Sequence, residues 1–207
     1  MQIAIVGAGK VGAAIAGHLA RLGHEVVLAN SRGPESLAAL AAELGPPARA
    51  DTVEGAVRDA ELVVLSVPYK AVDEIARAAA PWDGKIVIDA TNYYAGRDGA
   101  ELDPGEESSS ALVAGKLAGA RVVKAFNTLY AESTATEGRP DAPEDDRLAV
   151  LLAGDDEDAK ATVAGLVRDM GFAPVDHGSL REGGRAQEPG TPLYGAQLTG
   201  AETRAAL

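Results

Sequence analysis

The run Gly7-Ala8-Gly9-Lys10-Val11-Gly12 has the glycine spacing that lets a backbone wrap around phosphate groups. It follows an apolar segment, 2–6, and opens a segment with helical periodicity, 10–22, which is the strand–turn–helix context that the motif requires. The first glycine permits a tight turn, the second a close approach to a diphosphate, and the third close packing of helix on sheet. Unpaired N–H groups at the start of the helix would bind the phosphates. The run predicts a dinucleotide site; the alternative is a glycine-rich turn without a ligand.

The second predicted strand ends in Asn30-Ser31-Arg32 and not in an acidic residue. Proteins that bind NAD usually place an Asp or Glu about 20 residues beyond the glycines, on the ribose 2′-hydroxyl. A carboxylate would repel a 2′-phosphate, whereas the Ser31 hydroxyl and the Arg32 guanidinium can bind one. These residues favour NADP(H) over NAD(H), although Glu35 would interfere if it turned inward. The alternative is a solvated Arg32 before a helix, with Ser31 or Gly33 as its cap.

Three later strands end in small polar or special residues: Ser66-Val67-Pro68-Tyr69-Lys70, Asp89-Ala90-Thr91-Asn92 and Lys124-Ala125-Phe126-Asn127-Thr128. Ligands of open α/β sheets bind outside the carboxyl ends of the strands, so these ends are expected to gather around a nicotinamide ring. Taken singly, such residues are more typical of turns and caps than of ligand contacts. The predicted cofactor-binding residues are Gly7, Ala8, Gly9, Lys10, Val11, Gly12, Asn30, Ser31, Arg32, Ser66, Val67, Pro68, Thr91, Asn92 and Asn127.

The chain offers few groups for acid–base catalysis. His18 and His24 are expected at the surface, and His177 lies either near the site or in a solvated loop. No His–Asp, Lys–Asp or Ser-x-x-x-Lys arrangement supports a catalytic dyad, so no catalytic residue is assigned. The absence of cysteine excludes disulfides, thiol catalysis and thiolate metal sites, and no metal site is predicted. Direct hydride transfer between two cofactors needs no dyad, because the cofactors carry the chemistry.

Short apolar segments alternate with Ala-rich helical ones, which predicts an α/β fold: a Rossmann-type, doubly wound, mostly parallel sheet with a short C-terminal extension. Most of these segments are apolar throughout, as expected of strands covered on both faces. The predicted strands are 2–6, 25–29, 62–67, 85–89, 121–125, 148–153 and 173–176, with a weaker one at 48–50. The predicted helices are 10–22, 35–44, 52–58, 69–79, 109–117 and 157–170.

Residues 1–180 are expected to form one NADP-binding Rossmann domain, with 181–207 as a short tail packed on the same domain. Segments 93–108 and 131–147 follow predicted strands and are long for connections, so we expect loops that act as lids or as mobile surface.

The formal net charge of −12 comes from 19 basic and 31 acidic residues without a basic cluster. Such a surface repels nucleic acid and anionic lipid, so neither is an expected partner. No apolar run is long enough to cross a membrane, and the N-terminus opens directly into a strand pattern. We therefore expect a cytoplasmic protein.

A set of motifs in this order and spacing resembles a known family. It comprises Ile3-Ala4-Ile5-Val6 with the glycine run, Asn30-Ser31-Arg32, Val67-Pro68, Asp89-Ala90-Thr91-Asn92 and Val123-Lys124-Ala125-Phe126-Asn127-Thr128. Together they resemble the NADPH-dependent reductases of the deazaflavin coenzyme F420, the F420-dependent NADP oxidoreductase family, over residues 1–180. The resemblance implies NADP(H) and coenzyme F420 as small-molecule cofactor substrates, direct hydride transfer between them, and a homodimer.

Carried onto this chain, the resemblance implies that Gly7, Gly9 and Gly12 bind the pyrophosphate. It places Ser31 and Arg32 on the 2′-phosphate, and it implies that the strand ends at Pro68, Asn92 and Asn127 border the two rings. The acidic stretch 141–146 fits a polyanionic deazaflavin tail only if it points away. Two other functions stay open: NADPH-dependent reduction of an ordinary flavin or of a small carbonyl or imine, and NADP(H) binding without catalysis.

Overall fold

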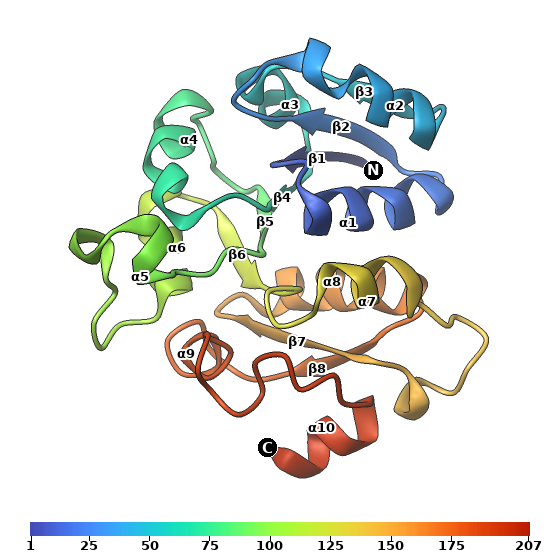
Figure 1. The fold of residues 1–207 in the computed structure, drawn as a ribbon, viewed down its shortest axis with the longest axis vertical. Helices are drawn as coiled ribbons and strands as arrows, with labels where there is room; N and C mark the ends of the chain where they lie inside the picture. The colour runs from blue at the N-terminus through green and yellow to red at the C-terminus, as the bar shows by residue number, and fades with distance from the viewer.

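Eight strands form one sheet in the computed structural model, which describes residues 1–207 (Figure 1). The strands are β1 (Gln2–Val6), β2 (Glu25–Ala29), β3 (Ala48–Ala50), β4 (Leu62–Leu65), β5 (Ile86–Asp89), β6 (Arg121–Lys124), β7 (Ala149–Gly154) and β8 (Ala173–Asp176). Their spatial order is β3-β2-β1-β4-β5-β6-β7-β8. All neighbours are parallel except β6 and β7, which are antiparallel. The first six strands have the order of a Rossmann fold.

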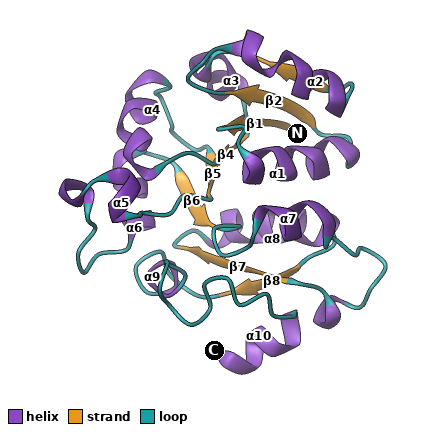
Figure 2. Cartoon of the chain, in the orientation of Figure 1, coloured by secondary structure: helices purple, strands orange, loops and turns teal.

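Ten helices connect and cover these strands (Figure 2). They are α1 (Lys10–Arg21), α2 (Ala38–Leu44), α3 (Val53–Asp59), α4 (Val72–Ala78), α5 (Ala95–Asp98), α6 (Ser109–Lys116), α7 (Ala131–Thr136), α8 (Glu157–Asp169), α9 (Gly183–Ala186) and α10 (Gly200–Ala206). None of them combines the length and the apolar character needed to traverse a lipid bilayer.

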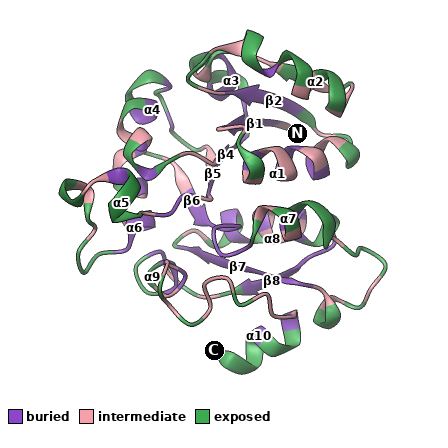
Figure 3. Ribbon diagram, in the orientation of Figure 1, coloured by how far each residue is buried: buried purple, intermediate pink, exposed green.

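The two faces of the sheet carry separate hydrophobic cores, and the buried strands lie between them (Figure 3). On one face Ile15 of α1 and Val163 of α8 pack against the strands. On the other face Val57 of α3, Ile75 of α4 and Val113 of α6 do the same. Burying an aliphatic side chain of this size contributes about 1.5–3 kcal/mol relative to leaving it exposed. The strands are therefore apolar on both sides, and the predicted fold class is confirmed.

The predicted strand positions agree with the structure. The strands predicted at 2–6, 25–29, 48–50 and 173–176 have the observed bounds, and the other four differ by one or two residues at one or both ends. Continuous burial gives these segments a clear apolar pattern, whereas the last residue of a strand depends on the turn that follows.

The two predicted loops are partly helical, so that prediction was wrong in part. Segment 93–108 contains α5, whose turn is held by the buried Asp98 carboxylate, which accepts hydrogen bonds from the N–H groups of Tyr94 and Lys70. Segment 131–147 contains α7, which packs along α1. Helices of four and six residues are too short to produce a recognisable apolar period.

His18 was predicted at the surface, and this prediction is wrong: the residue is 8% exposed. Its Nε2 donates a hydrogen bond of 2.8 Å to the Thr134 carbonyl oxygen, and its ring meets the edge of Phe172 at 5.5 Å. The unpredicted helix α7 covers this face of α1. Burial lowers the pKa of His18 below its ordinary value of 6.5, although the hydrogen bond to Thr134 acts in the opposite direction.

The chain beyond β8 returns along β7 and β8. The Ala149 N–H donates to the Leu198 carbonyl oxygen, and Leu193 packs on the outer face of β7 and β8. Thr199 and Glu202 form a reciprocal capping box that starts α10. Residues 181–207 thus pack on the same sheet as the residues before them.

Titration of His18 is expected to link stability to pH. Because its pKa is lower in the folded chain than in the unfolded one, the unfolded chain binds the proton more readily. Stability should therefore be full above about pH 6.5 and should fall as the pH drops below that value. Thermal melts between about pH 8 and about pH 5 should show a steeper loss of Tm for the wild type than for His18→Gln, which can still donate to Thr134. His24 and His177 are present in both proteins, so parallel Tm curves would contradict the assignment.

Candidate functional site

The turn between β1 and α1 depends on three glycines with distinct steric roles. Gly7 has a φ of +98°, and a Cβ there would lie 2.1 Å from the Ser66 carbonyl oxygen. A Cβ on Gly12 would lie 2.0 Å from the Gly7 carbonyl oxygen, so Gly12 lets α1 approach the turn. A Cβ on Gly9 would meet nothing within 4 Å, so the side of the backbone that a side chain would cover is open. These are the three roles that a diphosphate-binding turn requires.

The start of α1 is suited to an anion. Gly9 is the residue before the helix and offers no side-chain cap, and the first turn contains no acidic residue. The first N–H groups of an α-helix have no partner within it, and the helix dipole adds partial positive charge at this end. The residues present therefore fit the pyrophosphate of a dinucleotide.

A cavity of about 440 Å³, here called the nucleotide cavity, lies between the glycine turn, the end of β2 and helix α4. Helix α4 contributes Glu74, Ile75 and Ala78 to its lining. The predicted residues that line it are Gly7, Ala8, Gly9, Asn30, Ser31, Arg32, Ser66, Val67 and Pro68.

The end of β2 presents Ser31 and Arg32 at the rim of this cavity. The Asn30 side chain shapes the turn, since its Oδ1 accepts a 2.8 Å hydrogen bond from the Arg32 N–H and its Nδ2 donates to Ser36 Oγ. Ser31 and Arg32 are exposed, and the Arg32 guanidinium forms no ion pair or hydrogen bond within the chain. Glu35 does not line the cavity. The rim therefore carries the unpaired guanidinium of Arg32 at the place where NAD-binding proteins usually have an Asp or Glu.

A second cavity of about 290 Å³, here called the strand-end cavity, lies over the carboxyl ends of β1, β4, β5 and β6. It shares Gly9, Ser66, Val67 and Pro68 with the nucleotide cavity, so the two are neighbours along the same groove. Its lining also includes the predicted residues Lys10, Val11, Asn92 and Asn127. All the predicted site residues except Gly12 and Thr91 thus line one of the two cavities.

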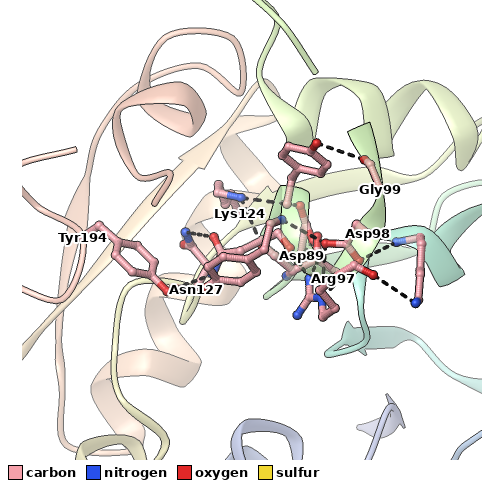
Figure 4. Close-up of polar contacts among 12 residues, drawn as sticks. Asp89, Arg97, Asp98, Gly99, Lys124, Asn127 and Tyr194 are labelled. Carbon is pink, nitrogen blue, oxygen red and sulfur yellow. Dashed lines mark hydrogen bonds and ion pairs between the residues drawn. The ribbon is translucent and has the colours of Figure 1, made fainter. Parts of the chain in front are cut away.

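An amide pair joins two of the strand ends at the wall of the strand-end cavity (Figure 4). Asn92 Nδ2 donates a 2.8 Å hydrogen bond to the Asn127 carbonyl oxygen, and Asn127 Nδ2 donates to Asn92 Oδ1. Asn127 Nδ2 also donates to the carbonyl oxygen of Gln187, which follows α9. Between β6 and Asn127, Phe126 has a φ of +62°, a strained conformation for a bulky residue.

The lining of the strand-end cavity also includes Tyr94, Arg97 and Tyr194, none of which was predicted. The hydroxyls of Tyr94 and Tyr194 are hydrogen-bonded to each other, and the Arg97 guanidinium lies 4.8 Å from the centroid of the Tyr94 ring. Burial and the hydrogen bond with Tyr94 raise the pKa of Tyr194 above its ordinary value. Tyr194 comes from the Gly- and Pro-rich end of the chain, where no sequence pattern marks it.

Behind the amide pair lies a buried charge cluster that sequence reasoning missed. Lys124 and Asp89 end β6 and β5, pair in register, and have fully buried side chains. Lys124 Nζ lies 3.9 Å from Asp89 Oδ2, with the Ser110 hydroxyl hydrogen-bonded to both. Burial lowers the pKa of Lys124, and the charge of Asp89 opposes that shift. This Lys–Asp pair lines neither cavity, so it does not alter the expectation that no Lys–Asp arrangement supports a catalytic dyad.

His177 and the acidic stretch lie away from the cavities. His177 follows β8, is partly exposed and lines neither cavity, and burial lowers its pKa. Gly138 and Pro140, which precede the acidic stretch, line a groove with Arg21 at the C-terminal end of α1. Within the stretch, carboxylates pair with arginines of α8 and α10. The acidic stretch therefore does not face the glycine turn.

Comparison with known proteins gives matches along most of the chain. The chain is 35% identical to the hypothetical protein SMa0349 from Sinorhizobium meliloti, whose solved structure aligns with a TM-score of 0.84 over 96% of this chain and 95% of that one. A candidate F420-dependent NADP reductase from Arthrobacter sp. FB24 is 29% identical, with a TM-score of 0.74 over 87% of this chain and 86% of that one. The rat (Rattus norvegicus) metalloreductase STEAP3 is 31% identical over 179 residues, which are 86% of this chain.

The chain spans about a third of the length of the rat metalloreductase, since the match covers 34% of that protein. Residues 2–93, which include the glycine turn, the end of β2 and the ends of β4 and β5, match the family described as NADP oxidoreductase, coenzyme F420-dependent. The motifs that line the nucleotide cavity fall inside that match. Residues 2–93 thus match the F420-dependent NADP oxidoreductase family, and the chain as a whole is similar in sequence and fold to a candidate reductase of that kind.

Proposed function

We propose that the protein transfers a hydride directly between NADP(H) and the deazaflavin coenzyme F420. One observation carries the proposal: the nucleotide cavity continues into a strand-end cavity whose lining includes three aromatic rings, two amides and two cations. No carboxylate and no histidine lines the strand-end cavity. Such walls suit two flat rings better than they suit a substrate that needs a protein acid or base.

NADP(H) as one ligand is supported by steric and electrostatic features of the nucleotide half. The start of α1 offers N–H groups to a diphosphate, and open space lies over Gly9. Ser31 and Arg32 are free to bind a 2′-phosphate, and no acidic residue at the end of β2 opposes it. Because the protein as a whole is acidic, this anion must be held by such local donors.

A deazaflavin as the other ligand is supported by the strand-end half. The ionisable residues in its lining are Lys10, Tyr94, Arg97 and Tyr194, and none is paired as an acid–base dyad with a carboxylate or an imidazole inside the cavity. When bound, NADPH would supply a hydride that the oxidised deazaflavin accepts at a ring carbon, with a proton from water taken at a ring nitrogen. The chain would contribute alignment of the rings by Pro68, Asn92 and Asn127 and exclusion of competing acceptors.

A small carbonyl or imine is a second candidate acceptor, because the Tyr94–Tyr194 hydroxyl pair could protonate the product. The two acceptors predict different roles for Tyr194. For a carbonyl or imine, the phenolic O–H would be the general acid. For a deazaflavin, the ring of Tyr194 would be a wall of the site, and no proton would pass through its hydroxyl.

The first test mixes the purified protein with NADPH and oxidised coenzyme F420. We expect the visible band of the deazaflavin to bleach in step with the loss of NADPH absorbance, one for one. Tyr194→Phe should change KM for F420 and leave kcat unchanged, because no proton passes through the hydroxyl in this reaction. If the physiological acceptor is a carbonyl or imine, the same substitution should lower kcat for it by about 10²- to 10⁴-fold. An unchanged deazaflavin spectrum at high protein concentration would sink the F420 proposal.

The second test concerns the 2′-phosphate. Arg32→Ala should weaken NADPH binding by about 1–3 kcal/mol, or roughly 5- to 150-fold in Kd, because a charge-assisted hydrogen bond is lost. NADH has no 2′-phosphate, so its Kd should change far less. Calorimetric titration of both cofactors measures the difference. Arg181→Ala removes the same charge from a residue that lines neither cavity and should leave both Kd values unchanged. Equal losses for NADPH and NADH would remove Arg32 from the 2′-phosphate.

A further inference from the structure

The buried Lys124 is held by oxygen atoms of three neighbouring residues (Figure 4). Its Nζ donates hydrogen bonds of 2.7 Å to Ser110 Oγ and 3.3 Å to the Thr91 carbonyl oxygen, and it lies 3.9 Å from Asp89 Oδ2. All four residues are buried, at 0% or 1% exposure. The ammonium therefore exchanges its hydration for protein oxygens from β5, α6 and the turn after β5.

The cluster fixes both backbone polar groups of one residue in that turn. Asp89 Oδ1 accepts a 2.9 Å hydrogen bond from the Thr91 N–H, and Lys124 donates to the Thr91 carbonyl oxygen. Thr91 is thus clamped through its backbone, and its side-chain hydroxyl has no hydrogen-bond partner in the chain. The contacts of the cluster act on the position of the backbone at residue 91.

The next residue transmits that position to the strand-end cavity. Asn92 follows Thr91 and lines the cavity, where it exchanges two hydrogen bonds with Asn127. Arg97 fixes the other side of Asn92 by donating to its carbonyl oxygen at 2.5 Å. Asn92 is therefore positioned by two sets of contacts: the charge cluster holds the residue before it, and Arg97 holds its own carbonyl oxygen.

The contribution of the Lys124–Asp89 cluster to the stability of the fold does not explain its presence. The cost of removing a lysine and an aspartate from water is of the same size as their attraction, and apolar replacements of similar volume are often as stable. The sheet neighbours of these two residues are packed by apolar side chains without any such device. The distinctive result of the cluster is the fixed backbone at Thr91.

We propose that Lys124, with Ser110 and Asp89, is the positioning element for the Asn92–Asn127 amide pair, and that this pair orients the nicotinamide half of NADP(H) in the strand-end cavity. The inference rests on the NADP(H) part of the proposed function and is independent of the acceptor. Lys124 acts through Thr91 and Asn92 and does not touch the ligand. Its loss should therefore affect the nicotinamide half and spare the adenosine half.

The experiment compares two ligands on one protein: NADPH, and adenosine 2′,5′-bisphosphate, which has only the adenosine half. Lys124→Met removes the charge and keeps most of the side-chain length. We expect the Kd for NADPH to rise about tenfold or more while the Kd for the bisphosphate stays within about twofold. The change in dihydronicotinamide fluorescence on binding should also shrink toward the value of free NADPH. Both readouts are made without an acceptor and without turnover.

A matched control is available in Lys160. This lysine is also nearly buried, and its Nζ pairs with Asp176 Oδ2 at 2.9 Å, but it lines neither cavity. Lys160→Met should lower Tm without changing the ratio of the two Kd values. If Lys124→Met gives the wild-type ratio, or weakens both ligands equally, the proposal is wrong.

Two further variants cover the case in which Lys124→Met fails to fold. Ser110→Ala removes only the hydroxyl between the two charges and should shift the ratio of Kd values in the same direction by a smaller amount. The double variant Lys124→Met with Asp89→Asn leaves no lone buried charge and should show the full shift. An unchanged ratio in a folded Ser110→Ala protein contradicts the proposal. Wild-type protein that binds neither ligand contradicts the NADP(H) proposal itself, and failure to reduce F420 leaves this test intact.

Discussion

The contact between the start of α1 and the end of β1 is the constraint on which the rest of the structure depends. Gly12 lies against the Gly7 carbonyl oxygen, and Gly7 lies against the carbonyl oxygen of Ser66 at the end of β4. Neither approach leaves room for a methyl group. Close contact there brings the helix N-terminus to the sheet edge and sets Ser66 and Pro68 beside it. Both cavities share these residues, so the glycine turn locates the whole groove.

Much of the fold was predictable because strands that are buried on both faces of the sheet are recognisable as short, continuously apolar segments of the sequence. β1, β2 and β8 are apolar except for one polar residue at an end, and α1 and α8 are long enough to show a period. Helices α5 and α7 were missed because each is held by tertiary contacts and not by its own sequence: the Asp98 carboxylate turns α5, and α1 supports α7. The burial of His18 was missed for the same reason, since it depends on α7.

The candidate site divides in a similar way. Its nucleotide half is local in sequence, because the glycines and Arg32 carry their chemistry in short motifs, and these residues were predicted. The other half is made by contacts between distant segments. Tyr194 meets Tyr94 across a hundred positions, and Lys124 meets Ser110 and Asp89 from separate elements. No spacing rule joins such residues, and they become visible only when the sheet places their strands side by side.

The reversal of direction at β7 has a consequence for how the two cavities can change independently. Because β7 runs against β6, the chain passes through β8 and then returns, so that Gln187 meets Asn127 and Tyr194 closes one wall of the strand-end cavity. The same returning segment contributes nothing to the lining of the nucleotide cavity. Substitution of Tyr194 would therefore reshape the strand-end cavity from a part of the chain that is remote in sequence, while every residue that lines the nucleotide cavity stays the same.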